Sequence, residues 1–205
     1  MPFHPLRHAL ADVLLTRLRD VDTGVVEFRA SADALSTLLA AAVTADLAVE
    51  PVRVQTPLAE TSGSRLERPV VLVPVLRAGL ALVDPLLRLI PWASVGHLGM
   101  ARDEETAVAR TYLCRLPNMR GVTVLVLDPM LATGGSLCDA LDQVKGSGAT
   151  DIRALCLVAA PEGLARVEKS HPDVAVYGVG LDDCLDDRKF IVPGLGDFGD
   201  RLCGF

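Results

Sequence analysis

From residue 70 onward, short apolar runs alternate with stretches whose apolar residues repeat at helical spacing. Apolar runs that predict buried strands lie at 69–74, 94–98, 121–127, 152–159 and 174–179. Helices are predicted between them, from residue 79 to about Leu89, from Gly134 to about Lys145, and over 161–170. Gly146 or Gly148 is expected to close the second of these helices, and Pro161 suits the first turn of the third. Strands that alternate with helices favour right-handed βαβ units and an α/β fold with an open parallel sheet flanked by helices.

The first 70 residues follow a different pattern. A helix is predicted over 7–19, where Leu10, Val13, Leu14 and Leu18 share one face. A second helix is predicted over 33–46, with Ser31 as a candidate cap. Residues 50–69 are mixed and contain the turn-forming residues 61–64, which predicts a hairpin or a loop.

Composition indicates what kind of core this pattern builds. The chain has 205 residues, of which half are apolar and only 4% aromatic. That length suits one domain, and its core must be built mainly from Leu, Val and Ala. Val/Leu runs of this kind are typical of strands buried on both faces of a parallel sheet.

Charge and hydropathy exclude several classes of function. The net charge is −6 and no basic block stands out, so we expect no nucleic-acid partner. Residues 2–5 interrupt any signal core, and the apolar stretch 38–49 is too short to span a membrane, so we expect no membrane insertion. The odd number of cysteines, without a CxxC pair, argues against a zinc or disulfide framework and favours reduced, mostly buried thiols in a cytoplasmic protein. They are Cys114, Cys138, Cys156, Cys184 and Cys203.

Residues 124–136 carry the clearest chemical signal. An apolar strand ends on Asp128, and Thr133-Gly134-Gly135-Ser136 opens the next helix. Gly134 and Gly135 allow the backbone to approach a ligand, and the N–H groups of a helix start suit a phosphate. No Lys follows the glycines, so this is not a Walker loop. Taken alone, the four residues fit an ordinary capped turn equally well.

The whole stretch resembles the motif with which type I phosphoribosyltransferases bind 5-phosphoribosyl-1-pyrophosphate (PRPP). Many members of that family carry two adjacent acids, whereas this chain has Pro129 after Asp128. The run from Asp128 to Ser136 is similar to the version found in uracil phosphoribosyltransferases. The resemblance extends over residues 16–205, roughly, and its motifs occur in the family's order.

Three further segments agree with this resemblance. Residues 73–80 resemble the family's pyrophosphate loop, in which Arg77 would add a guanidinium to backbone N–H groups. Residues 99–106 resemble a segment that begins a flexible arm, and there Arg102 is expected to meet the pyrophosphate; Ala101 and Asp103 depart from the family pattern. Without the resemblance, these would be a loop arginine in a surface ion pair and a solvated hairpin tip. Residues 158–163 are expected to close a strand and open a helix.

The segment 190–201 separates uracil from other bases. It resembles the C-terminal loop of uracil phosphoribosyltransferases, with Phe190 where the family usually has Tyr. Its three glycines and one proline exclude a regular helix or central strand. Backbone N–H and C=O groups of such a loop can match uracil, while purines and cytosine would leave polar atoms unpaired. Without the resemblance, the segment would be a glycine-rich surface tail.

The resemblance implies a complete site and reaction. The phosphoribosyl group of PRPP would pass to N1 of uracil, giving UMP and pyrophosphate in pyrimidine salvage. Mg²⁺ would be bound through PRPP, without direct protein ligands, and GTP activation and a homodimer or higher homo-oligomer are further expectations. The expected catalytic residues are Asp128, Asp197 and Arg102, with Asp197 also the candidate acceptor of the N1 proton. Those expected to bind PRPP are Arg77, Arg102, Asp128, Pro129, Met130, Leu131, Ala132, Thr133, Gly134, Gly135, Ser136 and Asp197. Those expected to bind uracil are Ile191, Gly196, Asp197 and Phe198.

The implied architecture is a single domain of residues 1–205. Its core would cover about 70–180, and a uracil-binding hood segment would cover about 181–205. The N-terminal segment would contribute to this hood, and a hairpin arm would protrude from the body.

Three alternatives stay open at this point. Another phosphoribosyltransferase, such as a purine enzyme, would share the PRPP motif but not the C-terminal loop. A regulator that senses nucleotides and binds RNA would need the basic cluster that this chain lacks. An inactive paralogue acting as a structural subunit would not need the charged residues of the motifs, which are intact here.

Overall fold

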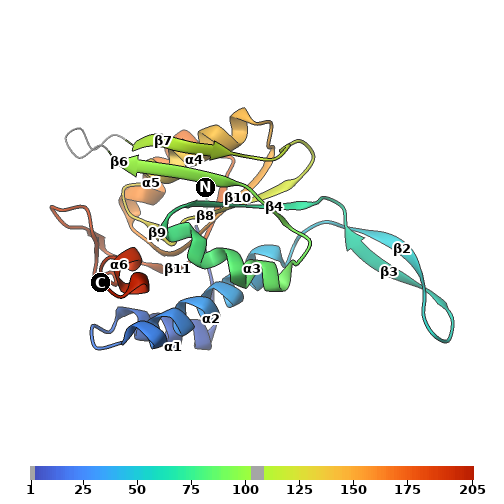
Figure 1. Cartoon of the computed structure of the whole chain (residues 1–205), viewed down its shortest axis with the longest axis horizontal. Coiled ribbons are helices and arrows are strands. Elements are labelled where there is room, and N and C mark those ends of the chain that lie inside the picture. Colours follow the sequence, from blue (N-terminus) through green and yellow to red (C-terminus); the bar gives the residue numbers. More distant parts are fainter. Residues whose placement is uncertain (1–2, 103–108) are drawn as a thin grey trace.

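A mostly parallel sheet runs through the centre of the molecule (Figure 1) in the computed structural model, which describes residues 3–102 and 109–205. The strand order is β1-β11-β10-β8-β4-β6-β7, and the β6–β7 pair is antiparallel. This confirms the predicted sheet. Its strands are β1 (Phe3–Pro5), β4 (Val70–Leu76), β5 (Ser94–Val95), β6 (His97–Arg102), β7 (Ala109–Arg115), β8 (Thr123–Leu127), β9 (Met130–Leu131), β10 (Asp151–Ala159) and β11 (Ala175–Leu181).

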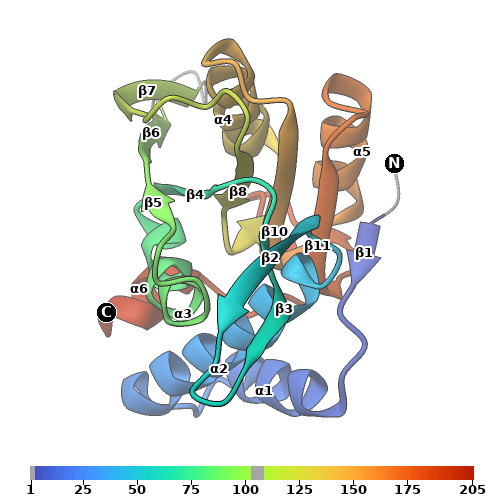
Figure 2. The ribbon, with the colours of Figure 1, turned by 90° about the vertical axis from the view of Figure 1, so that its right-hand side faces the viewer.

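Helices cover both faces of the sheet, so strands β4 and β8 are buried almost along their whole length. The helices α1, α2 and α3 pack on one face, where Leu72, Leu125 and Leu155 point, and α4 and α5 pack on the other. Figure 2 shows the same layers from the side, with β1 at the margin of the sheet beside β11. The helices on the sheet are α1 (Ala9–Arg19), α2 (Val25–Thr44), α3 (Val83–Leu89), which follows the 3₁₀ turn η1 (Ala78–Leu82), α4 (Gly135–Gly146) and α5 (Pro161–Ser170).

The second helix is longer than predicted. It begins at Val25 after the cap residue Gly24, so the assignment of Ser31 as its cap was wrong. Ser31 is buried in the middle of the helix. The apolar spacing already starts with Phe28, which is fully buried against the sheet and continues the face of Leu35.

Residues 49–66 form the predicted hairpin, and Figure 1 shows it protruding from the body of the molecule. Its strands are β2 (Val49–Gln55) and β3 (Glu60–Leu66). The predicted turn was misplaced, because residues 61–64 lie inside β3. The chain reverses before them, where the Thr56 hydroxyl accepts hydrogen bonds from the N–H groups of Leu58 and Ala59 at 3.2 and 3.0 Å.

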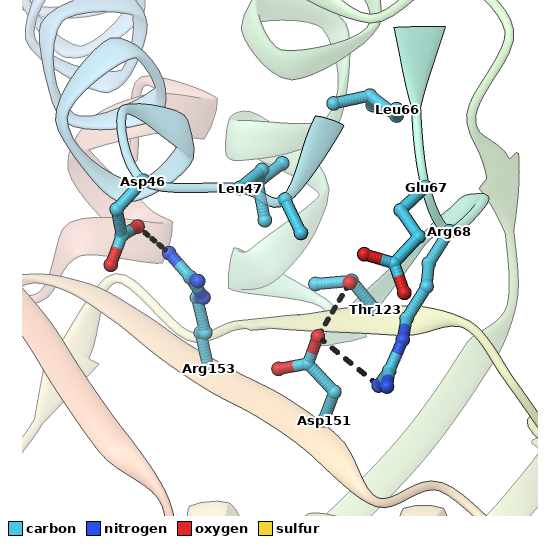
Figure 3. Close-up of a pocket in the computed structure, with 9 residues that line it drawn as sticks. Asp46, Leu47, Leu66, Glu67, Arg68, Thr123, Asp151 and Arg153 are labelled. Atoms are coloured by element: carbon cyan, nitrogen blue, oxygen red, sulfur yellow. Dashed lines mark hydrogen bonds and ion pairs between the residues drawn. The ribbon is translucent and has the colours of Figure 1, made fainter. Parts of the chain in front are cut away.

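A polar pocket lies where this hairpin joins the sheet (Figure 3). Thr123 and Asp151, the first residues of β8 and β10, lie on its floor and share a hydrogen bond of 2.6 Å. Arg68 lies 3.8 Å from the Asp151 carboxylate, and Arg153 pairs with Asp46. Because the parallel strands begin here, the pocket lies at the opposite edge of the sheet from the loops that carry the predicted motifs.

The structure tests the expectation that the cysteines are reduced and mostly buried. All five cysteines are free, but only Cys138 and Cys156 are buried, so the expectation of mostly buried thiols was wrong. Burial raises the pKa of the Cys156 thiol, and the neighbouring Asp128 carboxylate raises it further.

Among the helices of the described residues, none combines the length and the hydropathy that a membrane span requires.

Candidate functional site

The sheet has a topological switch point between the neighbouring strands β4 and β8, and this point defines a crevice at the carboxyl edge of the sheet. From β4 the chain continues outward to β6, whereas from β8 it continues in the opposite direction to β10 and β11. Ligands bind to open α/β sheets at such a switch point. Arg77 follows β4 and Asp128 follows β8, so two of the predicted site residues flank it.

Gly79 allows the two loops to meet. A Cβ atom at this position would lie 2.3 Å from the carbonyl oxygen of Leu127, which immediately precedes Asp128. It would also lie 3.2 Å from the Cα atom of Pro74. The loop after β4 can therefore pack directly against the end of β8 only with a glycine at position 79.

The predicted phosphate loop lies at the start of α4. Gly134 caps this helix in the left-handed conformation, with φ +75°, and the helix begins at Gly135 as predicted. A Cβ atom on Gly163 of α5 would lie 2.5 Å from the Ala132 carbonyl oxygen, so α5 supports the loop from below. Since β10 ends at Ala159 and α5 begins at Pro161, the prediction that residues 158–163 close a strand and open a helix is confirmed. The half-buried Thr133 and Ser136 lie beside a helix start whose N–H groups have no intrahelical acceptor.

A pocket of about 250 Å³ brings three of the predicted segments together. The loop after β4 contributes one residue, the loop after β8 contributes two, and the C-terminal segment contributes the rest. Four of these, at positions 191 and 196–198, are the residues predicted to bind uracil. The lining residues are Ala78, Met130, Ala132, Arg188, Lys189, Phe190, Ile191, Gly196, Asp197, Phe198 and Gly199.

The C-terminal segment contains more regular structure than predicted. Strands β12 (Cys184–Leu185) and β13 (Ile191–Val192) form a small hairpin, and α6 (Phe198–Cys203) follows it. The exclusion of a helix from 190–201 was therefore wrong for its last residues, because the glycines that break the chain, Gly194 and Gly196, precede α6. Asp197 is the N-cap of α6, and its Oδ1 accepts a hydrogen bond of 2.9 Å from the N–H of Asp200.

The N-terminal helices hold this segment in place, as the predicted hood requires. Arg201 donates to the carbonyl oxygens of Leu195, at 2.9 Å, and Asp20, at 2.6 Å. Its guanidinium lies 4.5 Å from the ring centroid of Phe28, which also contacts the Phe198 ring. The N-terminal helices therefore contact the C-terminal segment that lines the pocket, although they do not line it themselves.

Two predictions in the segment 99–106 are only partly covered by the structure. Arg102 is the last residue of β6 and so lies at the carboxyl edge, but the position of its side chain stays a prediction. Residues 103–106, including Asp103, lie outside the described residues. Within the described ranges, no group of three or more His, Cys, Asp or Glu side chains is arranged to hold a metal ion.

Sequence reasoning missed Arg188 and Lys189, which line the pocket. They form the turn of the β12–β13 hairpin, where the Lys189 N–H donates to the Asp186 carbonyl oxygen at 2.9 Å. The Arg188 guanidinium lies 5.4 Å from the Phe190 ring centroid. A basic pair directly before the predicted base loop was the available signal.

Lys189 has φ +68°, a left-handed conformation that side chains with a Cβ atom rarely adopt. We expect Lys189→Gly to raise the free energy of unfolding by about 0.5 kcal/mol, because relief of this conformation outweighs the greater entropy of an unfolded glycine. Thermal or denaturant unfolding measures the difference. Lys189→Ala is the control, since it removes the same ammonium group but keeps the strained backbone. Equal stability of the two variants would contradict the prediction.

Comparisons with known proteins agree over nearly the whole chain. The model of the family described as uracil phosphoribosyltransferase matches residues 5–204. A uracil phosphoribosyltransferase of Malacoplasma penetrans is 46% identical over 198 residues, with 96% of each chain covered. Another, from Staphylococcus aureus, is 44% identical over 203 residues, covering 98% of this chain and 97% of its own.

Solved structures place the fold in the same group. The AQ2163 protein from Aquifex aeolicus superposes with a TM-score of 0.93 at 37% identity, covering 98% of this chain and 97% of its own. A hypoxanthine phosphoribosyltransferase from Trypanosoma cruzi gives a TM-score of 0.54 at 17% identity, covering 77% of this chain and 76% of its own. The second likeness bears on the fold alone.

Proposed function

Since the chain belongs to the uracil phosphoribosyltransferase family, and so transfers the phosphoribosyl group of PRPP to uracil with formation of UMP and pyrophosphate, we propose that the loops around the switch point divide this reaction among them. The observation that carries the proposal is the pocket of about 250 Å³, in which the loops after β4 and β8 meet the C-terminal segment. The proposal treats residues 1–205 as one catalytic domain, with its core over about 70–180 and its hood over about 181–205.

The loop after β8 binds the ribose phosphate. The N–H groups at the start of α4, with the Thr133 and Ser136 hydroxyls, hold the 5-phosphate, assisted by the helix dipole. Asp128 accepts hydrogen bonds from the ribose hydroxyls. Residues 129–132 lie along the ribose, between the residues that bind its hydroxyls and those that bind the 5-phosphate. Met130 and Ala132 of this stretch also line the base pocket.

Arg77 and Arg102 stabilise the negative charge that develops on pyrophosphate as the bond to ribose C1 breaks. Magnesium usually binds through one or two carboxylates together with substrate phosphates, and Asp128 and Asp197 are candidate carboxylates among those near the carboxyl edge of the sheet. This donor set suits Mg²⁺ that arrives with PRPP, where it would neutralise phosphate charge. The catalytic work of the chain itself is to orient the reactants and to hold cations near the leaving group.

The C-terminal loop reads the base through its backbone. Ile191 and Gly196 to Phe198 line the pocket, and there their peptide groups can pair with the carbonyl and N–H groups of uracil. Asp197 accepts the N1 proton, directly or through water. Because one of its oxygens already caps α6, the second oxygen has to serve this purpose.

The chain assembles as a homodimer or a larger homo-oligomer in the cytoplasm, and GTP is a candidate activator. The protruding β2–β3 hairpin is the observation that supports the proposal of an oligomer. It exposes the apolar side chains of Val49, Val54 and Leu58, and Leu58 is 96% exposed.

The test of the function is a set of reactions with PRPP, Mg²⁺ and one labelled base each. UMP formed from uracil alone would support both the reaction and the base pocket. A nucleotide formed from cytosine, hypoxanthine, guanine or adenine instead would leave the PRPP assignment standing and contradict the pocket. If uracil gives no product with or without GTP, the proposed function is wrong.

Arg102→Ala should reduce kcat about 100-fold, because it removes one cation from the developing charge of the leaving group. Its melting temperature should change little, since the residue ends an edge hairpin. Steady-state kinetics and thermal unfolding measure the two effects. Arg115→Ala, on the paired strand β7, is the control and should leave kcat unchanged. Unaltered kinetics in Arg102→Ala would remove this residue from the mechanism.

A further inference from the structure

A buried ion pair joins the first helix to the end of β11. Arg19, the last residue of α1, donates to both carboxylate oxygens of Asp182, through Nη1 to Oδ2 at 2.8 Å and through Nη2 to Oδ1. The Asp182 side chain is 3% exposed and that of Arg19 is 26% exposed. The Asp182 N–H also donates to the Ala159 carbonyl oxygen at 2.9 Å, which ties the backbone of Asp182 to the end of β10. Its position is therefore fixed by the sheet.

Both sides of Gly194 bind to this pair. The Gly194 N–H donates to Asp182 Oδ2 at 2.7 Å, and its carbonyl oxygen accepts from Arg19 Nη1 at 2.7 Å. Gly194 has φ +62°, and a Cβ atom there would lie 2.0 Å from the Ile191 carbonyl oxygen. The backbone of Gly194 therefore packs tightly against Ile191, which lines the base pocket, and this turn is hydrogen-bonded to the ion pair.

We propose that Arg19 and Asp182 are positioning residues for the base: they do not line the pocket, but they hold the Gly194 turn so that the peptide groups around Ile191 and Gly196 face uracil. This inference rests on the proposed function. Hydrogen bonds to charged groups are stronger than those between neutral groups, so the pair restrains the turn more than a neutral contact would. The PRPP loop lies on other elements, between β8 and α4.

Arg19→Lys and Asp182→Asn test this role. Lysine keeps the charge but cannot donate to Asp182 and Gly194 in the same planar arrangement. Asparagine keeps the volume but loses the charge that binds Arg19. For each variant we expect the KM for uracil to rise about tenfold, while the KM for PRPP changes by less than about twofold. Arg19→Lys is the milder change and keeps the test usable if Asp182→Asn folds poorly.

Arg153→Met is the matched control. Arg153 also bridges a helix and the sheet through an aspartate, but it does so at the opposite edge, with a side chain 13% exposed. The Arg153→Met variant should have a lower melting temperature but the same ratio of the KM for uracil to the KM for PRPP. If Arg19→Lys behaves like this control, or raises both KM values equally, the pair is only structural and the proposal is wrong.

Amide hydrogen exchange gives a measurement that does not depend on activity. In Arg19→Lys the Gly194 amide should exchange at least about tenfold faster than in the unmodified chain, because the acceptor of its N–H is no longer held in place. Residues 128–136 should keep their exchange rates. Unchanged exchange at Gly194 would overturn the proposal even if UMP formation were lost. Faster exchange there would support the restraint of the turn by the ion pair, and the two KM values then decide whether this restraint acts on the base.

Discussion

Asp128→Asn should lower kcat/KM for PRPP about 100- to 1000-fold, which corresponds to about 3–4 kcal/mol of transition-state stabilisation. Asp128 follows β8 directly at the switch point and is half-buried beside the start of α4. An amide of the same size accepts hydrogen bonds from ribose hydroxyls without the negative charge, so the bonds weaken while the packing is conserved. Steady-state kinetics with varied PRPP measure the loss, and the melting temperature should stay close to that of the unmodified chain.

Asp151→Asn is the matched control for this substitution. Asp151 begins the neighbouring strand β10 at the opposite edge and accepts a hydrogen bond from Thr123. An asparagine can still accept that bond, so catalysis should be unaffected. Were Asp128→Asn to retain kcat/KM at the level of Asp151→Asn, the assignment of Asp128 to the ribose would be untenable.

Gly79→Ala should damage both stability and catalysis. The added methyl group would lie 2.3 Å from the Leu127 carbonyl oxygen, far inside contact distance. Neither group can rotate away, because the backbone fixes the Cβ position and the carbonyl oxygen belongs to the backbone of a buried strand. We expect a loss of about 3 kcal/mol in the free energy of unfolding, at the upper end for overpacking, and a melting temperature lower by about 10 °C. Because the displaced carbonyl precedes Asp128, kcat/KM should also fall at least about tenfold at temperatures where the variant is folded.

Gly146→Ala separates this effect from the general consequence of replacing glycine. Gly146 ends α4, and no atom lies within 4 Å of the Cβ position there. Alanine should be neutral or stabilising by a few tenths of a kcal/mol at this helical position. Comparable stability of the two variants would show that the loops after β4 and β8 do not need this close approach.

The parallel core could be predicted from the sequence because its signal is local. Strands β4, β8 and β10 are buried on both faces, so each reads as a continuous Val/Leu/Ala run, and the helices between them keep their apolar spacing. The site could be placed for a related reason. In a parallel sheet the residue after each strand lies at one edge, which brings Arg77 and Asp128 to the same crevice.

Features that depend on contacts distant in sequence could not be predicted in this way. Strand β1 has three residues and no apolar run, and it exists because it pairs with β11. The cap that starts α6 is a carboxylate that the sequence analysis assigned to catalysis, although Asp is also one of the residues preferred at a helix N-cap. The pairing of Arg19 with Asp182 spans 163 residues, and no local pattern connects the two.

The order of synthesis gives the C-terminal segment a further consequence. Arg19 precedes its partner Gly194 by 175 residues, and Phe28 likewise leaves the ribosome long before its partner Phe198. Domains fold as the chain emerges, so the sheet and its phosphate loop can form on the nascent polypeptide while the base pocket is still open. A nascent chain that pauses before residue 190 would therefore already have a site for PRPP but none for uracil.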